Sequence, residues 1–374
     1  MAIQQFEVKK QFEVKKDAIE ETRWVSIPLP PLEEGQLRVR VHHGAFTSNN
    51  ISYAVMGETF RYWDFFQPQS PGWGCIPLWG FAQVTESHVK GIEEGERLYG
   101  YFPMATHLTL EPKKISDGRF VDGVAHRSAL PAIYNEYSRL KNDPFHDSEK
   151  EPFRALFFPL AATSFGLADW LEQQDGKGAD HIICLSASSK TALGTAMLAK
   201  EKCPAKPIIG ITSEKHVGVV ENLNIYDRVL SYDEIEKLPT DQSYVIVDFA
   251  GNGHISAKLH THLKDQMRHN ILVGASHPEA PRKAQGMNQE RSALFFMPSY
   301  AEERMKETGG LFGKGMWKAA AQITDHAAQW MTLVGANTQD SITALYHKVR
   351  EGKLRADEGG HITFPSGDKA YANT

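Results

Sequence analysis

The sequence predicts an α/β protein in which a β-rich first domain is followed by a domain built on a parallel sheet. The first observation is residues 181–200, where an apolar run ends in a polar turn and a helix-forming segment follows directly. The second is that apolar runs alternate with helical segments over residues 207–275, as in a parallel sheet covered on both faces. The third is the clustering of short strands between glycine turns before residue 110.

Length and composition limit the possible classes of protein. The 374 residues suit two domains, and the 41% hydrophobic and 23% charged content is typical of a soluble globular protein. The net charge of −5 without a basic stripe argues against nucleic acid as a partner. The sequence has neither an apolar run long enough for a membrane span nor a signal-peptide core. Three irregularly spaced cysteines predict reduced thiols in a cytoplasmic protein.

The first domain is expected to cover residues 1–155. The hexamer QFEVKK occurs twice, at 5–10 and 11–16, and predicts a lengthened edge strand or a frayed arm. Alternating apolar and polar residues predict a half-buried strand at 36–46. Further strands are predicted at 76–86 and 97–110. Together these segments favour a compact β-barrel-like domain.

The second domain is expected to cover residues 156–300. Strands are predicted at 181–185, 207–212, 227–231, 244–249 and 270–275, with helices at 191–202, 215–223 and 253–265. Residues 301–374 are expected to add two helices and a strand that returns to the first domain. These elements are predicted at 313–334, 338–352 and 361–364.

Residues 186–192 form the strand-to-helix turn that is suited to a pyrophosphate, because backbone N–H groups and the dipole at a helix start attract phosphate. Matched to the fingerprint G-x-G-x-x-G/A, its three small positions are Ser186, Ser189 and Ala192, so that serines replace two glycines. The turn therefore either holds a nucleotide or is an ordinary buried junction. Its other polar residues are Ser188, Lys190 and Thr191, of which Lys190 would complement the phosphate charge.

The order of β-rich domain, nucleotide-type domain and return segment resembles the medium-chain dehydrogenase/reductase superfamily. The closest resemblance is to its zinc-independent quinone-oxidoreductase branch, and within it to a subfamily catalogued as a domain of unknown function. Besides the 186–192 turn, its landmarks are GQLRVRV at 35–41, EGERLYGYF at 94–102, FPLAATSF at 158–165 and DFAG at 248–251. The resemblance implies a GroES-like substrate domain with an insertion at 119–153, followed by a Rossmann-type NADP-binding domain.

The residues after the second strand of the cofactor domain favour NADP over NAD. An NAD site places Asp or Glu at this strand end to bind the ribose hydroxyl. Here Thr212 and Ser213 are followed by Lys215, and neutral donors with a cation suit a 2′-phosphate. The resemblance adds Tyr232, at the position of a family tyrosine that closes over the same phosphate. A solvated helix start is the alternative interpretation of these residues.

The segments that supply zinc ligands in zinc-dependent relatives lack such residues here. They read FTSNN at 46–50 and PLWGF at 77–81, without Cys, His or an acid. Because a catalytic zinc needs three protein ligands of these kinds, we expect metal-free chemistry. His42 and His43 are adjacent on a strand and face opposite ways, so we predict surface or packing roles for them.

Zinc-free relatives pass a hydride to an activated C=C bond or a quinone, while the protein supplies a dry pocket and a donor to the carbonyl oxygen. Asn49 or Asn50 lies where the family often has an active-site Asn, although each could equally hold a turn. Tyr53 follows, and Tyr134 or Tyr137 would donate a proton if the 119–153 insertion covers the cleft. Otherwise the insertion is a surface lid without catalytic groups.

Five aromatic residues either line a pocket or form core: Trp63, Phe65, Phe66, Trp73 and Trp79.

Ligands of parallel sheets bind outside the carboxyl ends of the strands. We therefore expect the nicotinamide in a cleft between the domains, near Asn49, Tyr53 and the small residues Gly274 and Ala275 at the end of the last strand. The resemblance adds two further contributions to the cofactor site, from Thr163 and from Ala250 of the DFAG segment.

These observations predict an NADPH-dependent reductase of an activated C=C, quinone or related carbonyl compound. The alternative is a non-redox protein, either a ligand-binding module or a lyase, that keeps the fold with a degenerate nucleotide site. The two lost glycines favour this alternative. We also expect a homodimer, because the superfamily continues its sheet across a two-fold axis and the 270–275 strand would otherwise be an exposed edge.

Overall fold

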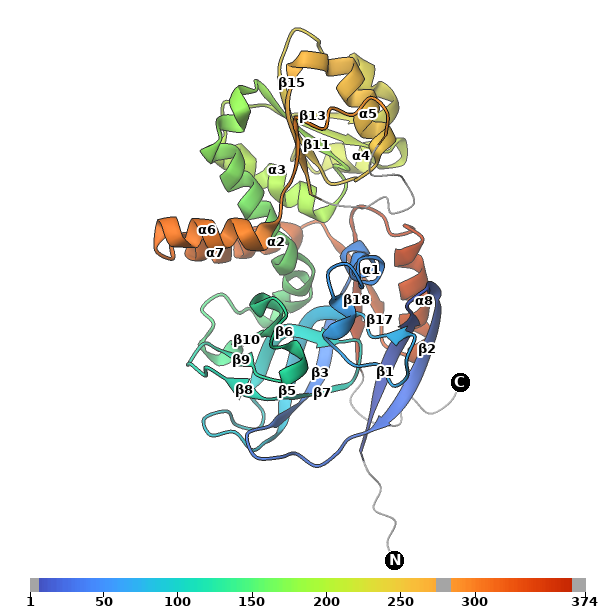
Figure 1. Cartoon of the computed structure of the whole chain (residues 1–374), viewed down its shortest axis with the longest axis vertical. Coiled ribbons are helices and arrows are strands. Elements are labelled where there is room, and N and C mark those ends of the chain that lie inside the picture. Colours follow the sequence, from blue (N-terminus) through green and yellow to red (C-terminus); the bar gives the residue numbers. More distant parts are fainter. Residues whose placement is uncertain (1–6, 274–283, 365–374) are drawn as a thin grey trace, which may run out of the picture. The chain divides into compact units, whose positions relative to one another are not determined.

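The computed structural model of the chain describes residues 7–273 and 284–364. The chain divides into two compact units, drawn in Figure 1 and described separately below. Unit 1 consists of Met1–Leu156, Thr332–Leu354 and Glu358–Thr374, and unit 2 of Phe157–Met331 and Arg355–Asp357. The long helix α2 (Glu151–Gln173) begins in unit 1 and continues into unit 2.

Unit 1 is built on a nine-stranded sheet of order β17-β18-β3-β5-β6-β10-β9-β8, with β7 paired to β3. Its strands are β3 (Leu37–Phe46), β5 (Pro77–Ser87), β6 (Arg97–Pro103), β7 (His107–Leu110), β8 (Pro112–Lys113), β9 (Arg119–Asp122), β10 (Glu136–Arg139), β17 (Thr332–Ala336) and β18 (Glu358–Thr363). The predicted strands at 36–46 and 76–86 are confirmed, and the one at 97–110 is two strands, β6 and β7. Leu98 and Phe102 of β6 point into the main core of the unit, so Tyr99 and Tyr101 lie on the opposite face.

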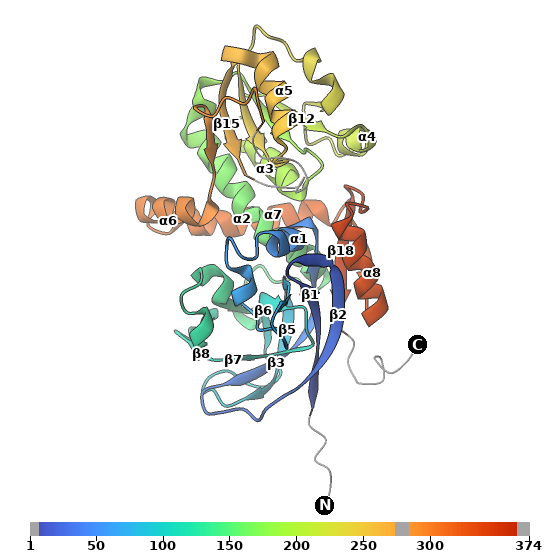
Figure 2. The same cartoon turned by 45° about the vertical axis from the view of Figure 1, so that its right-hand side comes forward.

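The described part of the repeat, residues 7–16, contains the central strand of a second, three-stranded sheet, so the prediction of an edge strand or frayed arm was wrong for these residues. β1 (Val8–Lys15) pairs on one side with β2 (Ala18–Pro28) and on the other with β4 (Trp73–Gly74). Figure 2 shows the β1–β2 hairpin beside the helix α8 (Gln339–Arg350). Phe12 and Val14 are fully buried in the core. Glu13 is also buried, and its carboxylate accepts hydrogen bonds from Arg23 and Gln11.

The helices of unit 1 differ in part from the prediction. The helix predicted at 338–352 is confirmed as α8, and the return strand predicted at 361–364 is confirmed as β18, which pairs with β3. The sequence did not reveal α1 (Ser48–Val55), whose start is capped by Thr47 and Asn50. Short 3-10 helices complete the unit: η1 (Tyr62–Asp64), η2 (Ala125–Arg127), η3 (Ala132–Asn135), η4 (Leu140–Asn142) and η5 (Ser148–Lys150).

Part of the 119–153 segment belongs to the sheet of unit 1 and is not a lid. Its strands β9 and β10 extend the nine-stranded sheet beyond β6. Between them, the guanidinium of Arg127 pairs with the carboxylate of Asp122, and these residues are only 1% and 2% exposed. Charged residues are almost never buried to this extent unless they are paired. The segment therefore contributes core and sheet to the unit.

Unit 2 is built on a six-stranded parallel sheet of order β13-β12-β11-β14-β15-β16. Its strands are β11 (His181–Leu185), β12 (Ile208–Thr212), β13 (Arg228–Ser231), β14 (Tyr244–Asp248), β15 (Met267–Leu272) and β16 (Ser292–Leu294). Numbered within the unit, this is the order 3-2-1-4-5-6 of a dinucleotide-binding sheet. The five predicted strands are confirmed, although β15 lies a few residues earlier than predicted. β15 is not the edge as predicted, because β16 pairs with it.

Helices accompany the sheet of unit 2 as Figure 1 shows. They are α3 (Lys190–Lys202), α4 (Glu214–Asn222), α5 (Gly253–Leu263), α6 (Met297–Thr308) and α7 (Leu311–Ala327), with the short 3-10 helices η6 (Asp175–Gly178), η7 (Tyr232–Lys237) and η8 (Lys264–Gln266). The helices predicted at 191–202, 215–223 and 253–265 are confirmed. The helix predicted at 313–334 ends early, and its last residues enter β17. In the described part of the chain, no helix has the length and apolar character of a membrane span.

Candidate functional site

The turn between β11 and α3 adopts the nucleotide-type conformation without glycine. Ser186, at the first glycine position of the fingerprint, has a left-handed backbone with φ of 56°. Two side chains from outside the turn hold it in place. The Tyr226 hydroxyl donates to the carbonyl oxygen of Ala187 at 2.9 Å, and the Thr212 hydroxyl donates to Ser188 Oγ at 3.1 Å. The structure therefore brings Thr212, one of the predicted cofactor residues, to the turn.

Tyr232 also reaches this turn. Burial raises its pKa to about 12, while hydrogen bonds from the Ser186 side chain and backbone act in the opposite direction. Hydrogen bonds that lower a phenol pKa are donated to the phenol oxygen. Ser186 N–H is therefore already satisfied by Tyr232, and a phosphate that binds here has to replace or join this contact.

Two helix starts supply donors beside the turn. Ser189 caps α3, and its hydroxyl accepts a hydrogen bond from Ala192 N at 3.2 Å, so this side chain has a structural role. Ser213 is the N-cap of α4, but its side chain makes no capping hydrogen bond to the described backbone. Its hydroxyl is therefore available to a ligand. Lys215, exposed in the first turn of α4, adds a positive charge near the same helix start.

Lys190 and Thr191 begin α3, where backbone N–H groups are not used by the helix itself. The pKa of Asp357 is lowered mainly by a hydrogen bond from Arg355. The positive charge of Lys190 lowers this pKa further, so Lys190 lies close to Asp357. The Thr191 carbonyl oxygen accepts a hydrogen bond from Ser164 at 3.0 Å, which fixes α3 against α2. Thr163 is the neighbour of Ser164 on α2 and is partly exposed.

The structure describes only one of three further predicted cofactor residues. Ala250 is completely buried in the core of unit 2, and its N–H donates to the buried Asp248 carboxylate at 2.9 Å. Its role is therefore structural. Gly274 and Ala275 lie outside the described residues.

Sequence reasoning missed Gly210 of β12, which lies directly beneath the turn. We expect Gly210→Ala to lower the free energy of unfolding by about 1–3 kcal/mol, the usual cost of overpacking. The reason is that a Cβ at this position would lie 2.9 Å from both the Ala187 side chain and the Tyr226 ring. Urea denaturation measures the effect.

The matched control is Gly218→Ala, because a Cβ at Gly218 of α4 meets nothing within 4 Å. This replacement should stabilise by about 0.5–1 kcal/mol through the helix propensity of Ala. Equal effects of the two replacements would show that Gly210 does not shape the turn.

In unit 1, three candidate side chains meet around one oxygen atom. Asn49 and Tyr53 lie one helical turn apart on α1, and the Asn49 amide donates to the Tyr53 hydroxyl oxygen at 2.8 Å. The Trp79 indole N–H of β5 donates to the same oxygen at 3.3 Å. Burial raises the pKa of Tyr53 and outweighs the hydrogen bonds from Trp79 and Asn49, which lower it. The two N–H groups thus favour the phenolate that remains after Tyr53 gives up its proton.

Further tyrosines surround Tyr53. The ring of Tyr62 lies 4.6 Å and that of Tyr134 6.5 Å from the Tyr53 ring, measured between centroids. The hydroxyls of Tyr62 and Tyr134 are 3.1 Å apart and share a hydrogen bond. The Tyr101 ring lies 5.6 Å from the Tyr53 ring and 4.8 Å from the Tyr134 ring. We call Tyr53, Tyr62, Tyr101, Tyr134 and Trp79 the tyrosine cluster.

Two other candidates have structural roles instead. Asn50 accepts a hydrogen bond from Thr47 N at 2.8 Å and donates to the Pro77 carbonyl oxygen at 2.9 Å, so it holds the start of α1. Tyr137 lies on the core side of the sheet, over Gly100, and donates to the Tyr101 carbonyl oxygen at 2.8 Å. It is fully buried and contacts the backbone of Tyr101, on the face of the sheet opposite the side chains of the tyrosine cluster.

The five aromatic residues of the predicted pocket do not lie together in the structure. Phe65 and Phe66 pack against Tyr101 of the tyrosine cluster, to which Trp79 belongs. Trp63 lies in the main core of unit 1, and Trp73 packs against the Arg23 guanidinium. Only part of the predicted group therefore belongs to the candidate site.

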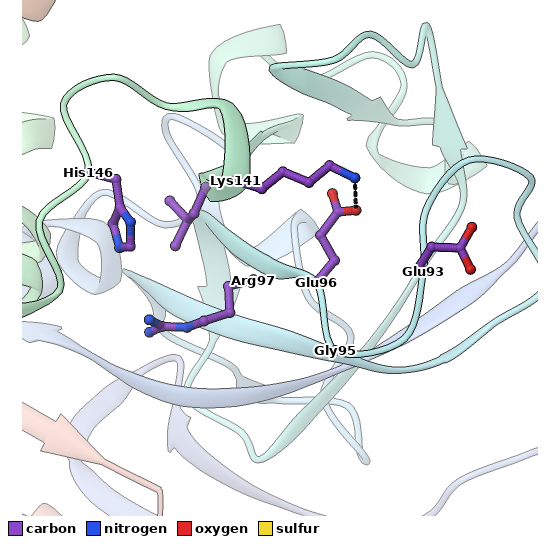
Figure 3. Close-up of a pocket in the computed structure, with 7 residues that line it drawn as sticks. Glu93, Gly95, Glu96, Arg97, Lys141 and His146 are labelled. Atoms are coloured by element: carbon purple, nitrogen blue, oxygen red, sulfur yellow. Dashed lines mark hydrogen bonds and ion pairs between the residues drawn. The ribbon is translucent and has the colours of Figure 1, made fainter.

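A surface pocket of about 410 Å³ in unit 1 is lined mainly by ionisable residues and is shown in Figure 3. Lys141 reaches the Glu96 carboxylate at 2.8 Å, and Arg139 pairs with the same carboxylate. Burial would raise the pKa of Glu96, but these bonds outweigh it and lower the pKa. Arg97 and His146, which also line the pocket, both bind Glu151.

Glu151, the first residue of α2, is the centre of a buried polar network. Its carboxylate contacts Arg97 at 2.6 Å, His146 at 2.7 Å and His43 at 2.9 Å. Burial would raise the pKa of Glu151, but these hydrogen bonds lower it to about 2. His43 also contacts His361 of β18 at 3.1 Å. The network anchors the start of α2 to unit 1, and this polar role of His43 goes beyond the predicted surface or packing role.

A protein-bound metal ion needs several ligand side chains that converge on one point. Within residues 7–273 and 284–364, no three or more His, Cys, Asp or Glu side chains are grouped so that they could hold a metal ion.

Solved structures share this fold over almost the whole chain. CurA in complex with NADPH, from Vibrio vulnificus, matches with a TM-score of 0.59 and 13% identity, covering 96% of this chain and 100% of that one. A mutant enoyl thioester reductase from Candida tropicalis matches with 0.58 and 10%, covering 96% and 100%. The quinone oxidoreductase from Coxiella burnetii matches with 0.52 and 14%, also covering 96% and 100%.

At these identities the likeness shows the fold, and the predicted α/β class with a GroES-like and a Rossmann-type domain is confirmed. A family model described as protein of unknown function (DUF2855) matches residues 45–355. The chain therefore belongs to this family. No curated protein matches the sequence significantly.

Proposed function

We propose that the protein is an NADPH-dependent reductase of an activated C=C, quinone or related carbonyl compound. The observation that carries this proposal is the Tyr53 hydroxyl, whose oxygen accepts N–H hydrogen bonds from Asn49 and Trp79. Such a tyrosine is suited to give a proton to a substrate oxygen, because the two N–H groups offset part of the cost of burying its phenolate. The similar structures support the class of reaction, since they include an NADPH complex, an enoyl thioester reductase and a quinone oxidoreductase.

The residues at the carboxyl ends of β11, β12 and β13 fit NADPH. The left-handed Ser186 supports a pyrophosphate at the start of α3, where Ser188, Lys190 and Thr191 also lie. Thr212, Ser213, Lys215 and Tyr232 supply hydroxyls and a cation for the 2′-phosphate, and Thr163 remains a prediction for the nicotinamide end. NADPH, when bound, supplies the hydride.

The alternative, a non-redox protein of the same fold, is favoured by one observation: Tyr232 already satisfies Ser186. Two measurements on the purified protein separate the proposals. The first is the change in NADPH fluorescence at micromolar cofactor, and the second is NADPH oxidation with a panel of enones, enoyl thioesters and quinones. Binding with oxidation of at least one compound supports the reductase. Binding without oxidation across the panel supports the alternative, and absence of binding contradicts the cofactor proposal.

We expect Lys215→Ala to weaken NADPH binding by about 1–3 kcal/mol and to leave NADH binding almost unchanged. The lost contact is a charge-assisted hydrogen bond to the 2′-phosphate, which NADH lacks. Titration of each cofactor by fluorescence measures both affinities. Lys258→Ala is a suitable control, because Lys258 is an exposed lysine of α5. An equal loss for both cofactors would refute the assignment of Lys215.

We further propose metal-free chemistry and a homodimer. In the segments that hold zinc ligands in zinc-dependent relatives, Asn49 and Trp79 instead bind the Tyr53 hydroxyl. For the dimer, the edge strand is β16, where Leu294 is 64% exposed, and pairing of two such edges would cover it. Elemental analysis that finds about one zinc per chain, or a concentration-independent monomer in light scattering, would contradict these proposals. A cytoplasmic location stays a prediction from the sequence.

A further inference from the structure

The hydroxyl of Tyr101 is buried and makes no hydrogen bond to any residue that the structure describes. A buried polar group without a partner lowers the stability of the folded state. Two other buried tyrosine hydroxyls of the same unit are paired: Tyr137 donates to the Tyr101 carbonyl oxygen, and Tyr346 donates to the Ile19 carbonyl oxygen. The unpaired hydroxyl of Tyr101 therefore needs an explanation other than packing.

Tyr101 belongs to the tyrosine cluster. It stands directly opposite Trp79 in the register of β5 and β6, and the two rings lie 5.1 Å apart on one face of the sheet. Its ring meets that of Tyr53 edge to face, at 5.6 Å and 87°. The Tyr53 oxygen already accepts two N–H hydrogen bonds, and no described residue accepts the Tyr53 hydroxyl hydrogen. The phenol hydrogens of Tyr53 and Tyr101 thus have no acceptor among the described residues.

We propose that Tyr101 is a second hydrogen-bond donor to the substrate carbonyl oxygen, beside Tyr53. This inference rests on the proposed reductase function and narrows its substrate class. The reacting C=C bond would be conjugated to a carbonyl group, as in an enone, an enoyl thioester or a quinone. An isolated alkene would offer no oxygen to the two donors.

The two phenols have different roles in this step. NADPH, when bound, would supply a hydride to the β-carbon, and the electron pair of the C=C bond would then move through the conjugated system onto the carbonyl oxygen. Tyr53 transfers its proton to that oxygen, and its phenolate, held by Asn49 and Trp79, later takes a proton from water. Tyr101 keeps its proton and only donates a hydrogen bond. Burial raises the pKa of Tyr101 strongly, and no N–H group of the described residues is placed to stabilise its phenolate.

A probe that needs neither the natural substrate nor NADPH tests the donor pair. The aromatic anion 4-nitrophenolate presents an oxygen like that of the reaction, and its visible absorbance reports binding. We expect Tyr101→Phe and Tyr53→Phe each to weaken binding to the full-length protein by about tenfold or more, as expected for a lost hydrogen bond to a charged group.

The matched control is Tyr346→Phe, which removes a buried hydroxyl with a structural partner in the same unit. This variant should bind the probe like the unaltered protein but melt at a lower temperature. Tyr101→Phe should melt at the same or a higher temperature, because it removes an unpaired buried hydroxyl. Weaker probe binding without a loss of stability is a result that a packing role does not produce.

The outcomes separate this inference from the proposed function. If the unaltered protein does not bind 4-nitrophenolate, or if Tyr101→Phe binds it equally well, the inference is overturned whatever the cofactor results show. If probe binding depends on both tyrosines but NADPH neither binds nor is oxidised, the donor pair is supported and the proposed reductase fails.

Discussion

Tyr53→Phe is expected to lower the turnover of an enone or quinone substrate by about 10²- to 10⁴-fold, the range for loss of a general acid. The replacement removes only the hydroxyl that Asn49 and Trp79 hold, and the ring remains to pack against Tyr62. NADPH binding should be unchanged, because the predicted cofactor residues lie in unit 2. Steady-state rates of NADPH oxidation, together with cofactor titration, measure the two effects.

Two further variants show whether the effect arises from proton transfer. Tyr134→Phe removes a hydroxyl of the tyrosine cluster that bonds to Tyr62 and not to Tyr53, so we expect a smaller loss. Asn49→Leu removes one N–H donor from the Tyr53 oxygen and should lower turnover by about tenfold, or roughly 1.4 kcal/mol of barrier. If Tyr53→Phe retains more than a tenth of the rate, the proton comes from water and the assignment of Tyr53 fails.

The parts of the fold that could be predicted are those whose signal is local. The strands β11, β12 and β14 are continuous apolar runs, and Ser186 follows the first of them directly. A buried parallel strand needs such a run whatever its neighbours are. Asn49 and Tyr53 are predicted together at one site, and their spacing of four residues places them on one face of a helix. This spacing was a usable signal for the contact between them.

The remaining site residues depend on contacts that sequence patterns do not encode. Trp79 and Tyr101 look like ordinary aromatic strand residues, and only the register of β5 against β6 places them opposite each other and beside α1. The central position of β1 in its sheet also depends on contacts that its sequence does not show. Glu13 belongs to the repeat that was expected in an edge strand or a frayed arm, but the fold buries it and satisfies its carboxylate with Arg23. A buried charge is thus identified by its partner, which the sequence does not show.

Arg127→Met is expected to lower the free energy of unfolding by about 3–5 kcal/mol, the usual result of removing one partner of a buried ion pair. The replacement leaves the Asp122 carboxylate inside unit 1 without its cation. It also removes the guanidinium from above the Phe66 ring, 5.0 Å from its centroid. Urea denaturation followed by circular dichroism measures the loss.

The double variant Arg127→Met, Asp122→Asn shows whether the unpaired charge is the cause. The amide introduced by the second replacement would keep an oxygen for the hydrogen bond that Asp122 accepts from Glu111 N at 2.8 Å, but it carries no charge. We therefore expect the double variant to recover at least half of the lost stability, since a neutral amide costs much less to bury than a carboxylate. If the single and double variants are equally unstable, the loss arises from the cavity and the contact with Phe66. The 119–153 segment would then be held in the sheet by packing and not by its buried ion pair.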